Sequence, residues 1–365
     1  MLHTCALNTA GLAYCWGSDF SGALGRGELR QFTSAAQPGA VSGGRSFAAL
    51  TVGSDFACAL TAAGSAYCWG DNQFGQLGDG TDGRAFAGIG AFGRASPVAV
   101  LGGHVFASVR AGGLHACGLD DAGQALCWGS HAFGQLAVGP YEPANDHRVT
   151  PTPAAGALRF LSLGLGALHT CGLATDSLTY CWGLNMKGQL GIDSAASPEK
   201  CAGGWPCSTR PIPLDSAFRF VAVTAGLRHS CGLTAGGTAY CWGDRVPTPQ
   251  PVAGLSFTTL VAGNEHTCGL TADGTAYCWG ENDRGQLGDG TVGPPETTPV
   301  AVATPMKFVS LAPSFAHTCG IGADGRAYCW GWNRRGQLGN GAIEAPNAAI
   351  NAVVPVPVRV RAPGS

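Results

Sequence analysis

The sequence predicts an all-β chain folded as a seven-bladed β-propeller. Three observations support this: a unit that recurs seven times, two cysteines ten residues apart in each unit, and four short strand-like segments in each complete unit. The units are marked by Cys-Trp-Gly signatures, which begin at Cys15, Cys68, Cys127, Cys181, Cys241, Cys278 and Cys329. Because the repeats run from end to end of the 365 residues, we expect a single domain over 1–365.

The segment between the paired cysteines is typical of a β-hairpin. In residues 268–278, the turn Thr-Ala-Asp-Gly-Thr separates two alternating flanks, and Gly274 supplies the positive φ that a three-residue hairpin loop needs. This register sets Cys268 opposite Cys278, at the Cα separation of about 4.5 Å of a non-hydrogen-bonded pair, within disulfide reach. We expect such hairpins over 5–15, 58–68, 117–127, 171–181, 231–241, 268–278 and 319–329.

The sixteen cysteines then form eight expected disulfides. Seven close the hairpins: Cys5–Cys15, Cys58–Cys68, Cys117–Cys127, Cys171–Cys181, Cys231–Cys241, Cys268–Cys278 and Cys319–Cys329. The eighth, Cys201–Cys207, closes a small loop within an insertion over 192–213. Buried thiols and zinc are the alternatives, but the spacing lacks the Cys-x-x-Cys knuckles usual in zinc sites. Complete pairing indicates an oxidising compartment.

The remaining segments of each repeat supply its other strands. A Phe-x-x-Val/Leu segment precedes the hairpin, and an Asn-x-x-Gly-Gln-Leu-Gly loop and a proline-containing segment lie between hairpins. The first repeat lacks its phenylalanine segment. The C-terminal strand, Val356–Val360, is therefore expected to close the propeller in the first blade, beside the hairpin of Cys5 and Cys15. Repeat five is the shortest and lacks the Gly-Gln-Leu-Gly loop.

The strings Gly-x-x-His-Thr-Cys-Gly-Leu, Ala-Tyr-Cys-Trp-Gly and Asn-x-x-Gly-Gln-Leu-Gly-Asp-Gly-Thr resemble the repeat of the regulator-of-chromosome-condensation family, most closely over 266–291. The resemblance implies a seven-bladed propeller. It leaves the function open, because the family includes a nuclear guanine-nucleotide exchange factor, ubiquitin-ligase accessory domains, a plant ultraviolet receptor and a secreted β-lactamase inhibitor. The paired cysteines depart from the family pattern. Leu227 stands where the ultraviolet receptor has a tryptophan.

Composition excludes several classes of function. Charged residues are 12% of the chain and the net charge is −2, so nucleic-acid binding has no basic footprint. No apolar run is long enough to span a membrane, and no signal peptide is visible. Since Met1 falls within a repeat, we expect the chain to be part of a longer polypeptide. Together with the cysteine pairing, this predicts an extracellular, cell-surface or periplasmic protein whose export signal is not in this chain.

Catalytic, cofactor and metal sites are not predicted. Six histidines share one repeat position: His3, His115, His169, His229, His266 and His317. Phe56 occupies that position in repeat two, which favours a packing and hydrogen-bonding role over metal binding. The Asp-containing loops offer too few oxygens for calcium. Neither a carboxylate pair nor a nucleophile with a base can be named.

The best indication of a binding site is a position that varies between repeats while the residues around it stay the same. The residue before Gly-Gln-Leu-Gly is Phe74, Phe133, Lys187, Arg284 and Arg335 in the five repeats that have the loop. These residues are expected to ring one face, aromatic on one side and basic on the other. Trp205 and Trp332 fall outside the repeated tryptophan position and are further candidates, because aromatic side chains are enriched at binding hot spots.

The sequence therefore predicts a non-catalytic module that binds an unknown protein or surface ligand. One alternative is a secreted inhibitor of an extracellular enzyme, which would use the same face. The other is a regulator similar to a guanine-nucleotide exchange factor, which would require a reducing compartment.

Overall fold

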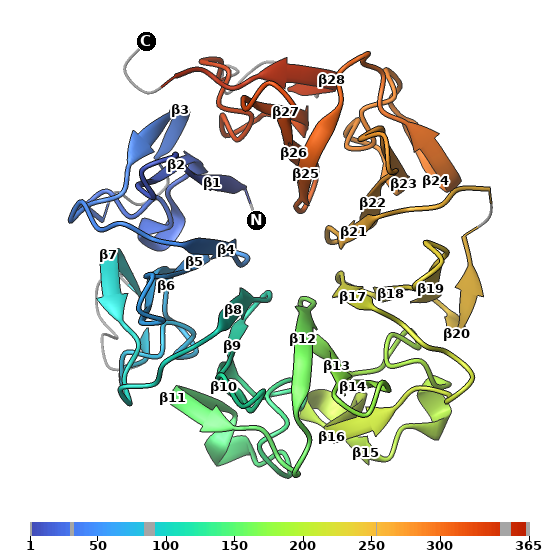
Figure 1. Cartoon of the computed structure of the whole chain (residues 1–365). Helices are drawn as coiled ribbons and strands as arrows, with labels where there is room; N and C mark the ends of the chain where they lie inside the picture. The colour runs from blue at the N-terminus through green and yellow to red at the C-terminus, as the bar shows by residue number, and fades with distance from the viewer. Residues whose placement is uncertain (1, 30–32, 84–91, 253, 344–351, 363–365) are drawn as a thin grey trace.

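The computed structural model is a ring of seven β-sheets around a central channel (Figure 1). It describes residues 2–29, 33–83, 92–252, 254–343 and 352–362. Each sheet is one blade, and its strands follow one another outward from the channel in sequence order, apart from a short extra strand in blade four. The all-β, seven-bladed propeller is confirmed.

The strand bounds are as follows. Blade one has β1 (His3–Leu7), β2 (Ala13–Ser18) and β3 (Ser34–Ala40). Blade two has β4 (Ala49–Val52), β5 (Phe56–Leu60), β6 (Ala66–Asp71) and β7 (Gly93–Ala99). Blade three has β8 (Ser108–Ala111), β9 (His115–Leu119), β10 (Ala125–Ser130) and β11 (His147–Pro153). Blade four has β12 (Phe160–Leu165), β13 (His169–Ala174), β14 (Thr179–Leu184), β15 (Glu199–Lys200) and β16 (Pro206–Pro213).

Blade five has β17 (Ala222–Ala225), β18 (His229–Leu233), β19 (Ala239–Gly243) and β20 (Val246–Pro251). Blade six has β21 (Thr259–Ala262), β22 (His266–Leu270), β23 (Ala276–Asn282) and β24 (Gly293–Ala301). Blade seven has β25 (Phe308–Pro313), β26 (His317–Gly322), β27 (Ala327–Trp332) and β28 (Val353–Arg359). The described connections contain the short 3-10 turns η1 (Phe20–Gly22), η3 (Pro143–Asn145), η4 (Ser194–Ala196) and η5 (Ala202–Gly204).

The cysteine hairpins have the predicted register. Cys268 lies opposite Cys278, and Leu270 lies opposite Ala276. The cysteine Cα atoms of that pair are 4.1 Å apart. All eight predicted disulfides are present. Each hairpin is thus fixed at its centre by a covalent bond, and in five of the seven blades both of its cysteines are buried.

Apolar residues from adjacent blades form the core between them. Between blades two and three, Phe56, Leu60 and Leu77 meet Phe106 and Trp128. In blades two to seven, the phenylalanine at the start of the inner strand packs on the tryptophan of its own blade, with ring centroids 5.5–6.1 Å apart. This explains why the phenylalanine and the tryptophan recur together.

The glycine of Gly-x-x-His allows the blades to approach each other. A Cβ on Gly166 would lie 2.3 Å from the carbonyl oxygen of Gly226 in the next blade, and one on Gly112 would lie 2.5 Å from that of Gly166. Such distances are well below van der Waals contact, so a side chain here would push neighbouring blades apart.

The predicted closure of the ring is wrong. β28 pairs with β27 in blade seven, with Cys329 opposite Val358, rather than with the hairpin of Cys5 and Cys15. The edge of β2 in blade one is already taken by β3, with Cys15 opposite Gly39. In every blade the proline-containing strand follows its own hairpin and folds back on it. The ring therefore closes by packing of blade seven on blade one, seen side by side in Figure 1, and not by a shared sheet.

Blade one has three strands among the described residues. In the part of the chain that the structure describes, no inner, phenylalanine-containing strand pairs with β1, as the sequence indicated. A cavity of about 400 Å³ lies at this position, lined by Leu7, Trp16, Leu50 and Leu311 among others.

The expected loop insertion over 192–213 is only partly a loop. Its second half is β16, the strand that pairs with β14, and β15 adds a two-residue strand beyond it. The proline pattern of this segment matches the outer strands of other blades, which explains why it enters the sheet.

Candidate functional site

One end of the ring, here termed the loop face, carries two sets of connections. Because consecutive strands are antiparallel, the turn before the second strand and the loop after the third lie at the same end. The Asp71 N–H donates to the Asp55 carbonyl at 2.8 Å, and the Glu281 N–H donates to that of Glu265 at 3.0 Å. The two residues that precede the repeat histidine, such as Asn264 and Glu265 before His266, therefore lie at the same end as the Gly-Gln-Leu-Gly loops. The opposite end carries the hairpin turns and is termed the hairpin face.

Each Gly-Gln-Leu-Gly loop is held by side chains of its own repeat. In blade six, the Leu287 N–H donates to the Asn282 side-chain oxygen at 3.2 Å, and the Arg284 N–H donates to Oε1 of Gln286 at 2.8 Å. The same glutamine bond orients the residue before the glycine in blades two, three, four and seven. The variable residue is thus displayed from a fixed frame.

The loops also connect each blade to the next. In blade six, the main-chain carbonyl of Gln286 accepts two hydrogen bonds from blade seven, from Trp330 Nε1 at 3.0 Å and from Thr318 Oγ1 at 2.9 Å. The leucine after the glutamine is fully buried at all five loops: Leu77, Leu136, Leu190, Leu287 and Leu338. Each loop therefore fills the space between two blades and bonds them to each other.

The predicted binding residues Phe74, Phe133, Lys187, Arg284 and Arg335 occupy equivalent, half-buried positions on five loops. The structure brings Arg284 and Trp332 together, with the guanidinium carbon 5.2 Å from the ring centroid. Trp205 is 47% exposed on the disulfide loop of blade four. That loop reaches blade three, where the Ala202 N–H donates to the Ala132 carbonyl next to Phe133.

Acidic residues on the loop face were missed by sequence reasoning. Asp244, Glu265 and Glu281 come from blades five and six and lie between the basic positions of blades four and six. Burial raises the pKa of Glu281, and the neighbouring carboxylates of Glu265, Asp283 and Asp244 raise it further. The one feature of the sequence that could have pointed to this acidic region is the absence of the Gly-Gln-Leu-Gly loop from repeat five.

A second acidic pair lies between blades one and two. Burial raises the pKa of Asp71 to about 6, although the Gln76 side chain donates a hydrogen bond to it at 2.6 Å. Asp55 lies nearby, and its charge also raises the pKa of Asp71.

Five of the six repeat histidines form hydrogen bonds to the next blade inside the protein. His115 Nε2 lies 2.9 Å from Thr170 Oγ1 of the next blade, and this hydroxyl donates to the Gln135 carbonyl, so the histidine is the donor. His169, His266 and His317 make the same bond to Ser230, Thr318 and Thr4, and His229 Nε2 lies 2.8 Å from Thr267 Oγ1. Desolvation lowers the pKa of His115 to about 3. The predicted packing and hydrogen-bonding role is confirmed.

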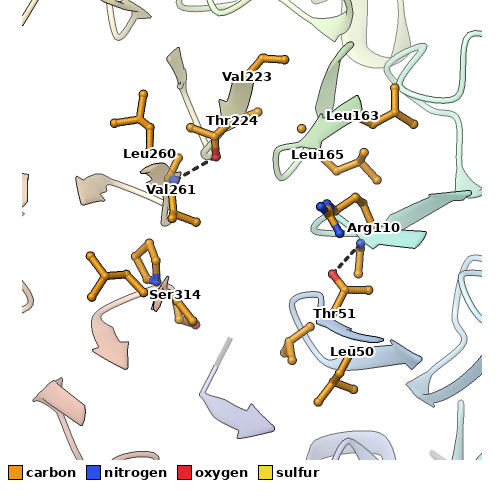
Figure 2. A pocket seen from close by; sticks show the side chains of 18 of the residues that line it. Leu50, Thr51, Arg110, Leu163, Leu165, Val223, Thr224, Leu260, Val261 and Ser314 are labelled. Carbon is orange, nitrogen blue, oxygen red and sulfur yellow. Dashed lines mark hydrogen bonds between the residues drawn. The ribbon is translucent and has the colours of Figure 1, made fainter. Parts of the chain in front are cut away.

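The central channel contains a cavity of about 570 Å³ lined by the inner strands. Figure 2 shows Arg110 near Leu163 and Leu165, with Thr51 accepting a hydrogen bond from the Ala111 N–H at 3.1 Å. Arg110 is the one side chain with a permanent charge among the described residues that line this cavity. Ser and Thr side chains and the repeat histidines His3 and His317 also line the cavity.

Within the described ranges, no group of three or more His, Cys, Asp or Glu residues is placed to hold a metal ion. No helix in the described part of the chain could cross a bilayer.

Two family models, both described as the regulator of chromosome condensation (RCC1) repeat, match this chain. One matches residues 47–76, 106–135, 220–244, 257–286 and 308–337, and the other matches 63–119, 273–321 and 324–365. Together they cover more than half of the chain.

Similar sequences include the ultraviolet-B receptor UVR8 of Arabidopsis thaliana, which is 26% identical over 93% of this chain and 65% of its own length. The probable E3 ubiquitin-protein ligase HERC6 of Homo sapiens is 30% identical over 54% of this chain and 19% of its own length. The chain thus spans less than two thirds of the length of these curated relatives.

Solved structures confirm the architecture. Yeast RCC1 (Prp20), in a crystal structure with Kap60, has a TM-score of 0.80 at 20% identity, covering 98% of this chain and 85% of its own. Human WBSCR16 has the same TM-score at 18% identity, covering 97% of this chain and 95% of its own. The ectodomain of the Arabidopsis thaliana receptor kinase ACR4 has a score of 0.55 at 22% identity, covering 90% of each chain.

Proposed function

This chain belongs to the regulator of chromosome condensation (RCC1) repeat family, and on that premise we propose that it is a non-catalytic protein-binding propeller of an exported or cell-surface protein. Its loop face is the binding surface. The observation that carries the proposal is the set of five equivalent loops, each fixed by an asparagine and a glutamine or their counterparts, that display different side chains. Preorganised side chains lose little entropy on binding.

The loop face offers two contrasting regions to a partner. Phe74, Phe133 and Trp205 lie on blades two to four, and Arg284, Trp332 and Arg335 lie on blades six and seven. Aromatic and arginine side chains contribute most of the binding energy at protein interfaces. A protein with an apolar patch beside an acidic one complements this arrangement.

The cysteines support the assignment of this protein to an oxidising compartment. Eight intramolecular disulfides, with no free cysteine in the described residues, are typical of an oxidising environment. This supports export and disfavours a role similar to that of an exchange factor, which would operate among reduced thiols. A secreted enzyme inhibitor would be a special case of the proposed function.

A charge-reversal experiment tests the proposal. One variant carries Lys187→Glu, Arg284→Glu and Arg335→Glu on the loop face, and its matched control carries Arg159→Glu, Arg219→Glu and Arg326→Glu on the hairpin face. We expect the wild-type protein and the control to capture the same protein from the culture medium or cell surface of the source. We expect the loop-face variant to capture at least tenfold less of this protein. Equal capture by both variants would contradict the proposed face.

A further inference from the structure

Blade five lacks the loop that the other six blades insert against their neighbours, five with Gly-Gln-Leu-Gly and blade one with Leu24 buried beside Trp69. β19 and β20 are joined directly by Asp244 and Arg245, and both residues have positive φ, 52° and 81°, as a tight two-residue hairpin turn requires. Blade six therefore receives neither the glutamine carbonyl nor the buried leucine of a preceding loop.

The receiving groups in blade six are nevertheless intact. In the five blades that follow a Gly-Gln-Leu-Gly loop, the tryptophan Nε1 donates to the glutamine carbonyl at 2.9–3.0 Å. Trp279 Nε1, like Trp69 Nε1, has no such acceptor among the described residues, but only Trp279 gains exposure, 7% against 0–2% for the other six Cys-Trp-Gly tryptophans. The Thr267 hydroxyl likewise lacks a carbonyl partner and lies 2.8 Å from His229 Nε2.

The omission leaves an open space, here termed the blade-five cleft. Its volume is about 440 Å³, and Trp242, Val252, Thr267 and Trp279 are among its lining residues. The apolar cluster between blades five and six contains no leucine equivalent to Leu287. The cleft is therefore shaped for an aliphatic side chain that follows a main-chain carbonyl.

The surroundings of the cleft are acidic. Asp244, Glu265 and Glu296 line it, and Glu281 lies near Glu265 and near Asp283, which is paired with Arg284 at 3.4 Å. Arg228 is the cation close enough to Glu281 to oppose this negative charge. An occupant with basic residues beside its aliphatic side chain would complement the cleft in charge as well as shape.

We propose that the blade-five cleft binds a loop of a partner protein, one that buries a leucine, presents a main-chain carbonyl to Trp279 and carries flanking Arg or Lys residues. This inference rests on the proposed function, because it names an anchor for the partner. The chain itself shows such an occupant: Arg334, Arg335, Gln337 and Leu338 fill the equivalent space between blades seven and one.

A peptide provides the direct test. The probe is a cyclised peptide with the sequence of residues 333–341, and the readout is the indole ¹⁵N–¹H resonance of Trp279, assigned with Trp279→Phe. We expect a saturable shift of this resonance. An analogue with serine in place of the leucine should bind at least tenfold more weakly. Absence of a shift at millimolar peptide, or an equal response to the serine analogue, would overturn the proposal.

Two protein variants complete the test. In one, residues 281–292 of blade six replace Asp244 and Arg245, so that the chain fills its own cleft. This variant should keep or raise its melting temperature and lose peptide binding, and undiminished binding to the folded variant would contradict the inference. In the other, Glu265→Gln with Glu296→Gln should weaken peptide binding at least threefold at low salt, while unchanged affinity would exclude the acidic contribution. If the loop-filled variant still captures the protein partner, the cleft fails as an anchor while the proposed function stands.

Discussion

At the scale of single residues, the repeat histidines differ in whether the next blade offers them a hydrogen-bond partner. His3 is the one repeat histidine whose Nε2 has no hydrogen-bond partner among the described residues, because the next blade has Ala57 where others have serine or threonine. A buried polar atom without a partner lowers stability.

We therefore expect Ala57→Ser to stabilise the protein by about 1 kcal/mol, because the new hydroxyl would accept the His3 N–H. Urea unfolding at pH 7.5 measures this. Ala59→Ser, which adds a hydroxyl at another fully buried alanine of the same strand, is the control and should destabilise. Equal effects of the two substitutions would contradict the explanation.

The histidines also make stability depend on pH. Burial lowers the pKa of His115, His169, His266 and His317 to about 3 in the folded protein, from 6.5. Below pH 6.5 the unfolded chain binds protons that the folded one does not, so stability falls as the pH falls from 6.5 towards 3.

His115→Phe, which copies Phe56, should reduce the stability difference between pH 7.5 and pH 5 by about 2 kcal/mol. Urea unfolding at the two pH values gives this difference, and the wild-type protein is the reference. An unchanged difference would mean that His115 does not remain neutral in the folded state.

At the scale of elements, the hairpin was the most predictable part of the fold. The paired cysteines and the turn glycine determine the register locally, so the sequence alone was enough to place Cys268 opposite Cys278. The strand Val353–Arg359 was misassigned because a proline-containing strand lies between two hairpins, and its pattern does not say which one it pairs with.

The hairpin disulfides should contribute measurably to stability. Replacing Cys268 and Cys278 together by serine is expected to cost about 2–3 kcal/mol, because the bond restricts a short loop of the unfolded chain. Denaturant unfolding beside the wild-type protein measures this cost. A cost below about 0.5 kcal/mol would show that packing alone holds the hairpin.

The candidate site was only partly predictable from the sequence. The loop residues from Phe74 to Arg335 could be named because they share one frame, but the pairing of Arg284 with Trp332 depends on the angle between two blades. The blade-five cleft could not be predicted from repeat five alone, because the missing loop leaves its space in front of Trp279 in the next repeat.

At the scale of the whole molecule, blade one differs from the other blades in the open inner edge of its sheet. Blade seven meets blade one without a shared sheet, and β1 has β2 as its single strand partner among the described residues. The contact includes the hydrogen bond between His317 and Thr4 at 2.8 Å.

We expect the amides of β1 to exchange with solvent faster than those of the equivalent strands β5, β9, β13, β18, β22 and β26, because one edge of β1 is unpaired. Hydrogen exchange followed by mass spectrometry measures this. Equal protection of β1 and β22 would contradict an open edge in blade one.

The central claim is that this propeller is a binding module whose hairpins are cross-linked by disulfides and which works in an oxidising compartment. The measurement that tests it most directly is the intact mass of the protein from its natural source, alkylated under denaturing conditions before and after reduction. The account predicts no alkylated thiol before reduction and sixteen after it, one for each cysteine in the sequence. Sixteen alkylated thiols before reduction would contradict it and favour a regulator that works among reduced thiols.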